Sequence, residues 1–250
     1  MTQGVQTLMA QQNGFTLWLT GMSASGKSTM AAYIAARLRQ VGRNVEILDE
    51  GEVADELWKG AGDSKEERNM SVRRLGYVAG LLTRNNVAAL VAAVSPYKQS
   101  REENRRAIGR YVEVYVDCPT EKLIQRDTTG KYKKALSGEI PNFIGITEPY
   151  EPPTSPEVTM RSDQETVEEG ALRIFQSLLD LGYVTAEDLK VITGKKMKAN
   201  PLPAKKNARR EEPKAPKADK GVKARPATRA ARVGKPAAKK APAAPKRKAR

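Results

Sequence analysis

The amino-acid sequence predicts an α/β fold of three layers, in which helices cover both faces of a mostly parallel sheet. Two observations lead to this prediction. Residues 15–195 alternate short apolar runs with segments of helical periodicity, the pattern that builds parallel βαβ units. A glycine-rich loop also stands directly between the first apolar run and the first helical segment, a typical position for a phosphate-binding loop.

Four segments are expected to be strands, because each is short, apolar or rich in β-branched residues, and is followed by turn residues. They are residues 15–19, 45–48, 87–94 and 111–116. Two helices are clearest, because their apolar residues recur at helical spacing. The stripes are Met30, Ile34, Leu38 and Val41 in the first helix, and Val167, Ala171, Ile174, Phe175 and Leu178 in the second.

Charge divides the chain of 250 residues into a neutral body and a basic end. Residues 201–250 hold 18 of the 44 Lys and Arg residues and 3 of the 29 Asp and Glu residues, which leaves 26 of each sign elsewhere. The whole formal net charge of +15 therefore belongs to this end. We expect an N-terminal extension (1–12), a folded domain (13–193) and a basic Lys/Ala/Pro-rich tail (194–250), which is too poor in large apolar side chains to be ordered.

Residues 127–156 interrupt the strand and helix pattern with a segment rich in Gly, Pro, Lys and Tyr. The segment is too long for an ordinary connection inside a compact domain, and long connections of this kind often close over a site. We therefore expect it to form a lid.

The residue types present limit the chemistry. Cys118 is the one cysteine and there is no histidine, so an internal disulfide, the commonest general base and the usual zinc ligand are all excluded. The first residues lack the pattern of a signal peptide, and the longest apolar run, 87–94, is too short to span a bilayer. We expect a cytoplasmic protein with no membrane contact.

The loop GMSASGKS, residues 21–28, matches the P-loop pattern in full. Glycines allow its backbone to curl with the N–H groups inward, and the following helix N-terminus adds positive potential. Lys27 is expected to reach the β- and γ-phosphates of ATP, and Ser28 to offer its hydroxyl to Mg²⁺. The fold is thus predicted to be a P-loop NTPase of the nucleoside-kinase kind, with ATP bound by Gly21, Ser23, Ala24, Ser25, Gly26, Lys27, Ser28 and Thr29.

Further motifs follow the P-loop in a collinear order. They are LDEGEV (48–53), ERNMSVRRLGYVA (67–79), VSPYKQSR (94–101), VYVDCP (114–119), RDTTGKYKKALSGEI (126–140) and FIGITEPYEPP (143–153). Together with the P-loop they make residues 13–180 resemble the adenylyl-sulfate kinase (APS kinase) family. The resemblance implies Mg²⁺-dependent transfer of the γ-phosphate of ATP to the 3′-hydroxyl of adenylyl sulfate, in sulfate activation, by a homodimer.

The resemblance also implies roles for single residues. Asp49 corresponds to the first acid of the family's DGD sequence, a carboxylate that orients or deprotonates the acceptor hydroxyl; a slip of one residue would place Glu50 and Glu52 on the two acids instead. Lys27 and Lys134 are the other expected catalytic residues, and Arg126 is expected near the ATP base. The expected acceptor-binding residues are Arg68, Ser71, Val94, Ser95, Lys133 and Phe143, the last by stacking on adenine.

Three acceptor positions depart from the family pattern. Ala54 or its neighbour stands where an arginine is expected, Asp63 where an aromatic residue is expected, and Ser71 where an asparagine is expected. These departures keep two alternatives open: a related kinase with a different nucleotide-linked acceptor, and an inactive kinase-like body that serves the tail. The tail itself has two interpretations. It either binds nucleic acid or other polyanions without sequence preference, or serves as a solubilising segment with no dedicated partner.

Overall fold

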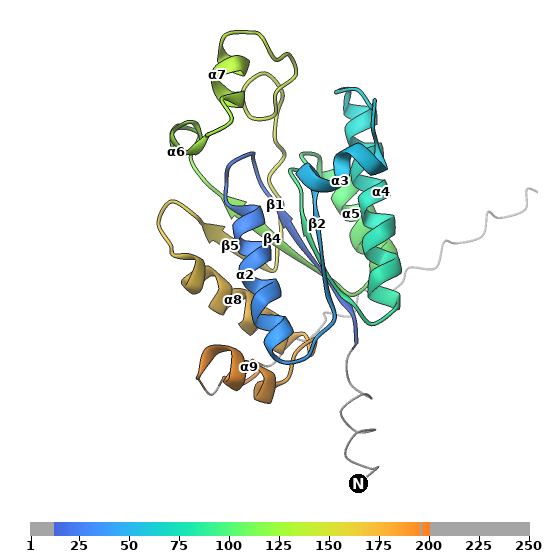
Figure 1. Ribbon diagram of the computed structural model, residues 1–250, viewed down its shortest axis with the longest axis vertical. Coiled ribbons are helices and arrows are strands. Elements are labelled where there is room, and N and C mark those ends of the chain that lie inside the picture. The colour runs from blue at the N-terminus through green and yellow to red at the C-terminus, as the bar shows by residue number, and fades with distance from the viewer. Residues whose placement is uncertain (1–12, 196, 201–250) are drawn as a thin grey trace, which may run out of the picture. The chain divides into compact units, whose positions relative to one another are not determined.

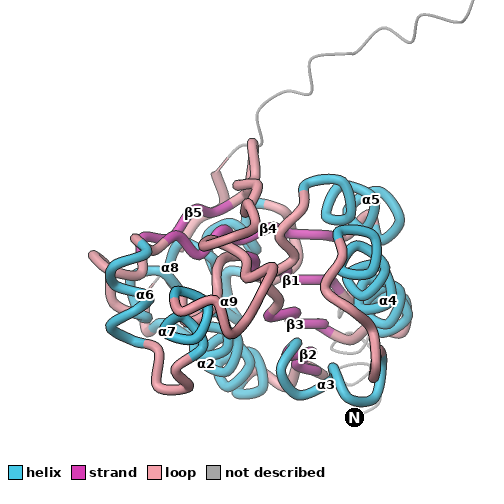
Figure 2. The backbone as a smooth tube through the Cα atoms, turned by 90° about the horizontal axis from the view of Figure 1, so that it is seen from above, coloured by secondary structure: helices cyan, strands magenta, loops and turns pink. Residues whose placement is uncertain are grey.

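The computed structural model describes residues 13–195 and 197–200. Within this part, five parallel strands form one sheet in the order β2-β3-β1-β4-β5 (Figure 2). The strands are β1 (Phe15–Thr20), β2 (Val45–Asp49), β3 (Ala88–Ala92), β4 (Tyr111–Asp117) and β5 (Val158–Arg161). Because every strand runs in the same direction, all their carboxyl ends meet at one edge of the sheet, where α/β proteins bind ligands.

Helices cover both faces of the sheet, which makes the predicted three layers (Figure 2). One face carries α2 (Lys27–Gln40) and α8 (Val167–Asp180), and the other carries α4 (Lys65–Arg84) and α5 (Lys98–Ile108). The remaining helices are α3 (Glu50–Leu57), α6 (Thr120–Arg126), α7 (Lys131–Leu136) and α9 (Ala186–Thr193). Figure 1 shows α6 and α7 beyond the carboxyl ends of the strands and α9 near their amino ends.

Side-chain alternation along β1 explains why the strand is central. Phe15, Leu17 and Leu19 are fully buried in the cluster that α2 and α8 cover, whereas Trp18 points into the cluster under α4. On that second face the hydroxyl of Thr16 makes a 2.8 Å hydrogen bond with that of Thr83 in α4. Burial of side chains on both faces fits a strand in the middle of a sheet that helices cover on both sides, and β1 indeed pairs with β3 on one side and β4 on the other.

The connections after β1 and β3 diverge. The chain leaves β1 into α2 on one face of the sheet, and leaves the neighbouring β3 into α5 on the opposite face (Figure 2). Such a reversal opens a crevice between the carboxyl ends of the two strands. The P-loop, the end of β2 and the turn after β3 all lie at this edge.

The structure confirms the predicted α/β fold class, and it contains a strand that the sequence prediction lacked. β5 has only four residues, Val158–Arg161, and alternates buried with exposed side chains at the edge of the sheet. With only two buried side chains, it is not distinguishable by apolar pattern from the Pro-rich segment that precedes it. Structure also continues past residue 193, since the Asn200 backbone N–H donates a 2.7 Å hydrogen bond to Asp180 of α8. Residues 1–12 and 201–250, the predicted extension and most of the predicted tail, lie outside the described residues.

Candidate active site

The P-loop curls because two of its glycines adopt backbone angles that side chains disfavour. Gly21 has a φ of 151° and Gly26 a φ of 101°. At Gly21 a Cβ atom would also lie 2.4 Å from the carbonyl oxygen of Val116 at the end of β4, so no larger residue fits. Glycine is therefore required where the loop passes over the sheet edge.

Lys27 is the first residue of α2 and its side chain is buried, with only 8% of the residue exposed. Its ammonium group donates hydrogen bonds to the carbonyl oxygens of Gly21 (3.0 Å) and Met22 (2.8 Å) inside the loop. Burial lowers the pKa of Lys27 to about 8, while the nearby carboxylates of Glu50 and Asp49 act in the opposite direction. The lysine thus faces both the phosphate loop and the acidic end of β2.

The N-terminus of α2 is open to an anion. Gly26 supplies no side-chain cap, and the first turn holds no acidic residue, so its free N–H groups and helix dipole favour negative charge. Ser28 and Thr29 are exposed in this turn. The buried hydroxyl oxygen of Ser25 has no hydrogen-bond partner among the described residues. These features fit a phosphate chain lying along the loop.

Two carboxylates stand at the end of β2, next to β3. Asp49 accepts a 2.9 Å hydrogen bond from the Gly51 backbone N–H and so caps α3. Glu50 accepts a 2.6 Å hydrogen bond from the Val94 backbone N–H, which joins the ends of β2 and β3. Both are half-buried and near enough to Lys27 to influence its pKa, whereas Glu52 is exposed on α3. The structure therefore brings Asp49 and Glu50, rather than Glu52, towards the P-loop lysine.

The turn after β3 is held by Ser95, whose hydroxyl is fully buried. This hydroxyl accepts a 3.0 Å hydrogen bond from the Trp18 indole N–H and lies 3.0 Å from the hydroxyl of Thr20. The backbone of Val94 is also engaged, since its N–H binds Glu50 and its carbonyl accepts from Thr20. The predicted acceptor contacts at these two positions therefore already have intramolecular partners.

Arg68 lies in the first part of α4 and reaches across the crevice to the lid. Its guanidinium donates hydrogen bonds to the Asp63 carboxylate (2.8 Å), the Asp63 carbonyl (3.0 Å) and the Asn142 carbonyl (2.8 Å). Ser71, in the next turn of α4, is half-buried. The predicted acceptor arginine is thus at the crevice, in contact with one of the three residues that depart from the family pattern.

The lid is anchored on the P-loop by a small cluster of its own. Tyr132 of α7 packs with Cys118 and Leu123, and its ring makes an edge-to-face contact with Phe143 at 4.9 Å between centroids. Met22 of the P-loop packs against the same cluster. Phe143 is therefore half-buried on the lid side of the P-loop.

The predicted lid lysines, Lys133 and Lys134, are exposed on α7, and their ammonium groups make no hydrogen bond or ion pair with any described residue. Arg126, in α6, donates to the carbonyl (2.8 Å) and hydroxyl (3.1 Å) of Ser162, just after β5. These contacts hold Arg126 at the side of the site that β4 and β5 border. The lysines have free ammonium groups, whereas the arginine is already bound.

Sequence reasoning missed two residues that shape the site. Tyr150 bonds the Thr20 hydroxyl at 2.9 Å, and Glu151 accepts a 2.8 Å hydrogen bond from the Lys98 backbone N–H at the start of α5. Both belong to the PYEPP motif, which had indicated the family without suggesting a contact. They fasten the end of the lid segment to the strand ends.

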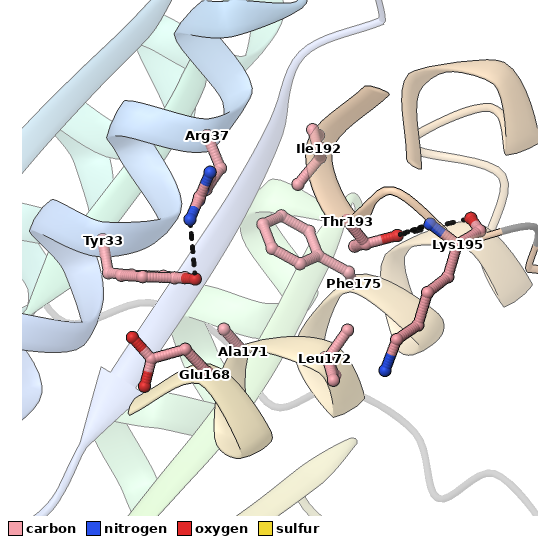
Figure 3. Close-up of a pocket in the computed structure, with 9 residues that line it drawn as sticks. All are labelled: Tyr33, Arg37, Glu168, Ala171, Leu172, Phe175, Ile192, Thr193 and Lys195. Carbon is pink, nitrogen blue, oxygen red and sulfur yellow. Dashed lines mark hydrogen bonds between the residues drawn. The ribbon is translucent and has the colours of Figure 1, made fainter. Parts of the chain in front are cut away.

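A separate cavity of about 160 Å³ lies between α2, α8 and the end of α9 (Figure 3). Figure 3 shows Tyr33 and Arg37 of α2 on one side, joined by a 3.2 Å hydrogen bond, and Phe175 and Ile192 opposite them. Its lining contains none of the predicted site residues. The predicted site residues gather instead at the carboxyl ends of the strands, which is where we place the candidate active site.

A P-loop with a buried lysine, an open helix N-terminus and carboxylates at the neighbouring strand end defines a P-loop phosphotransferase. Comparison with known proteins narrows the class. The sequence profile described as Adenylylsulphate kinase matches residues 13–161, so the chain belongs to the adenylyl-sulfate kinase family and is an ATP-dependent phosphotransferase of that type. This confirms the predicted family and enzyme class.

Individual relatives agree with the assignment. The chain is 49% identical over 174 residues to the adenylyl-sulfate kinase of Rippkaea orientalis, a match that covers 70% of this chain and 96% of the relative. Its fold is similar to that of the Mycobacterium tuberculosis APS kinase in complex with AMPPNP and APS, with a TM-score of 0.64 and 33% identity over 66% of this chain and 98% of the other. The hexameric APS kinase from Thiobacillus denitrificans matches with a TM-score of 0.53 and 29% identity, over 74% of this chain and 34% of the other.

In the part of the chain that the structure describes, no helix is both long enough and apolar enough to cross a bilayer.

Proposed function

We propose that this chain phosphorylates the 3′-hydroxyl of adenylyl sulfate with ATP, and so produces 3′-phosphoadenylyl sulfate for sulfate assimilation. The observation that carries the proposal is the position of Lys27, buried in the P-loop, within electrostatic reach of the Asp49 and Glu50 carboxylates at the end of β2. One half of this arrangement suits a phosphate donor, and the other half suits a hydroxyl that must lose a proton. A P-loop enzyme with both is a kinase.

The P-loop half binds the donor. Backbone N–H groups of the loop and of the first turn of α2 are directed at the phosphates, and the Lys27 ammonium exchanges the carbonyls of Gly21 and Met22 for phosphate oxygens. The hydroxyls of Ser25 and Thr29 lie where they can add hydrogen bonds. On the far side, Arg126 is held by Ser162 close to the expected place of the ATP base.

The residues present also fit a magnesium ion. Ser28 exposes its hydroxyl in the first turn of α2, and nothing among the described residues bonds to it. Mg²⁺ keeps most of its shell as water and phosphate oxygen, so one protein hydroxyl suffices. When bound, the ion would supply charge neutralisation at the transferring phosphate. Ser28 is the residue that would hold it.

The β2 half activates the acceptor. The Asp49 carboxylate takes the proton of the 3′-hydroxyl while the hydroxyl oxygen forms a bond to the γ-phosphorus and the bond to the ADP oxygen breaks. Glu50, bound to the Val94 N–H, is the alternative base. Arg68, with Ser71 and the turn at Ser95, borders the acceptor, and Phe143 offers a ring to its adenine.

Lid closure brings Lys133 and Lys134 of α7 over the transferring phosphate. Both ammonium groups are free of acidic partners among the described residues, so closure breaks no existing ion pair. Positive charge placed there would stabilise the transition state and exclude water.

The test is ADP release from Mg²⁺ATP with and without adenylyl sulfate. We expect release that depends on the acceptor, and its loss in Lys27→Ala. A matched control is Lys59→Ala, which removes an exposed lysine just after α3. If ATP binds but adenylyl sulfate does not stimulate release, the proposed acceptor is wrong and other nucleotide-linked anions should be screened.

A second proposal concerns the basic tail. The match to the Rippkaea orientalis enzyme covers 96% of that protein but only 70% of this chain, and the family profile matches residues 13–161, which precede the tail. With 18 basic and 3 acidic residues in 201–250, it carries the charge needed to bind a polyanion by counterion release. We propose that it binds nucleic acid without sequence preference.

The tail proposal is tested with duplex DNA of mixed sequence at two salt concentrations. Replacing the Lys and Arg residues of 201–250 with Gln in the full chain should abolish binding at low salt while kinase activity remains. Equal DNA affinity before and after this replacement would leave only the solubilising interpretation.

Two broader expectations stay predictions. A homodimer is expected from the family resemblance, and sedimentation would distinguish it from larger assemblies. A cytoplasmic location is expected from the sequence pattern, and cell fractionation would test it.

A further inference from the structure

The strongest unexplained contact at the crevice is the ion pair between Asp63 and Arg68. The carboxylate lies 2.8 Å from the Arg68 guanidinium, which also donates to the Asp63 main-chain carbonyl at 3.0 Å. One residue therefore takes two of the donors that a planar guanidinium offers to an anion. A third donor goes to the carbonyl of Asn142 in the lid, at 2.8 Å.

The loop before α4 is built so that Asp63 stays in this position. Ser64 is the N-cap of α4, and Glu67 completes a capping box with it. The same Glu67 carboxylate accepts a 3.0 Å hydrogen bond from the Gly62 backbone N–H. Asp63 lies between the two residues that Glu67 holds, so the local sequence presents its carboxylate to Arg68.

Asn142 contributes a second restraint from the lid. It adopts a left-handed φ of 55°, and its carbonyl accepts from Arg68 directly before Phe143. Arg68 also lies near Tyr97. Burial raises the pKa of Tyr97 above its ordinary value, and the positive charges of Arg68 and Lys65 offset part of this rise. The arginine is therefore surrounded by the lid, the N-terminus of α4 and the turn after β3.

The cations on this side of the crevice are matched by acids. Arg68 pairs with Asp63, and Lys65 lies 3.5 Å from Glu151. By contrast, the lid lysines Lys133 and Lys134 have no acidic partner among the described residues. The crevice beside Arg68 is thus already neutralised, whereas the lid above the P-loop is not.

We propose that Asp63 is a specificity-determining residue that competes with the acceptor's anionic group for Arg68. Acceptor binding exchanges the Asp63 carboxylate for an acceptor oxygen on the guanidinium, and the Asp63 side chain, 60% exposed, turns to solvent. This inference rests on the proposed acceptor role of Arg68. It predicts that the chain binds adenylyl sulfate more weakly than it would with a neutral residue at position 63.

Asp63→Asn is the direct test, because asparagine keeps the size and one acceptor oxygen of the side chain while removing its charge. We expect the KM for adenylyl sulfate to fall by about two- to fivefold, the range of one exposed ion pair, with kcat unchanged. Asp55→Asn is the matched control. It removes an exposed carboxylate on the nearby α3 that pairs with nothing described, and should leave KM unchanged.

A double-mutant cycle separates action through Arg68 from a general charge effect. In an Arg68→Ala background, Asp63→Asn should have no effect on KM, because the competition has no target. A KM that falls equally in both backgrounds, remains the same in Asp63→Asn, or rises in Asp63→Asn overturns the inference.

Titration calorimetry of adenylyl sulfate with ADP present separates this inference from the proposed reaction. If the native chain does not turn over adenylyl sulfate, but Asp63→Asn binds it more tightly than the native chain, the competition holds and the proposed reaction fails. Undetectable binding to both overturns the competition as well.

Discussion

The hydroxyl of Tyr132, on lid helix α7, donates a 2.9 Å hydrogen bond to the carbonyl oxygen of Ser23 in the P-loop. The two residues are far apart in sequence, and the bond joins the loop that holds ATP to the segment that closes over it. Met22, next to Ser23, packs against Gly145 on the other arm of the lid, where a Cβ would come within 2.3 Å of its sulfur. The lid and the P-loop are therefore joined on both arms of the lid, and we expect a change in one to affect the other.

Tyr132→Phe should weaken this coupling without disturbing the small core around the ring. The loss of one hydrogen bond, with a carbonyl left unpaired, corresponds to about 1 kcal/mol, so we expect the KM for ATP to rise by roughly fivefold. Steady-state kinetics measure the effect. Tyr77→Phe is the control, because Tyr77 is 68% exposed and its hydroxyl has no described partner. Equal kinetics in the two variants would contradict the coupling.

ATP affinity should depend on pH through Lys27. Burial lowers the pKa of Lys27 to about 8 in the free protein, and bound phosphate favours the charged ammonium. Affinity is therefore full below about pH 8 and falls above it, by up to about tenfold per pH unit, until the higher pKa of the complex is reached. Calorimetry in buffers of different ionisation enthalpy should detect proton uptake on binding. In Lys27→Arg the guanidinium stays charged, so ATP affinity should not fall in this pH range. An ATP affinity in the native chain that does not change with pH would show that Lys27 does not control it.

The two carboxylates at the end of β2 can be distinguished by neutral isosteres. Asp49→Asn keeps an oxygen to cap the Gly51 N–H but cannot accept a proton, so kcat should fall by about 10²- to 10⁴-fold with KM little changed. Glu50→Gln keeps the bond to the Val94 N–H, and we expect a loss of less than about tenfold. The reverse order would identify Glu50 as the base. Circular dichroism should show both variants folded.

Stability should depend strongly on Arg101, which is only 2% exposed. Its guanidinium binds Glu113 at 3.0 Å and the carbonyls of Ser95 and Glu151, both at 2.6 Å. Arg101→Met leaves the buried Glu113 carboxylate with a weaker set of partners, so the free energy of unfolding should fall by about 3 kcal/mol. Denaturant titration measures it.

Lys98→Met is the matched control on the same helix. It removes an exposed pair with Glu102, and should change the free energy of unfolding by less than about 0.5 kcal/mol. Similar decreases in the free energy of unfolding of the two variants would show that the buried contacts of Arg101 stabilise the fold no more than an exposed ion pair does.

Much of the fold could be predicted because its signals are local. The strand positions follow from short apolar runs, and α2 and α8 follow from stripes whose residues are adjacent on one helix face. β5 was missed because an edge strand of four residues buries only alternate side chains, which gives little apolar signal. The P-loop residues and the family motifs were likewise recognisable, since each is a continuous stretch.

The partners of the site residues could not be predicted. Asp63 and Arg68 are near neighbours in sequence, yet nothing in that spacing said that they pair, because the pairing depends on the loop geometry that Glu67 imposes. The Ser95 hydroxyl is directed inward to Trp18, a contact between β1 and the turn after β3. The hydrogen bond that the Val94 backbone N–H donates to Glu50 likewise joins the ends of β3 and β2.

The sequence by itself determined the fold class, the phosphate-binding loop, the family and the separation of a neutral body from a basic end. All of these depend on residue type and on spacing along the chain, which sequence displays directly. Only the tertiary structure decided which carboxylates lie near Lys27, that Arg68 bonds to the lid at Asn142, and that the lid is fastened to the P-loop by Tyr132. These relationships depend on distances between segments remote along the chain, and such distances exist only once the parallel strands bring their carboxyl ends to a common edge.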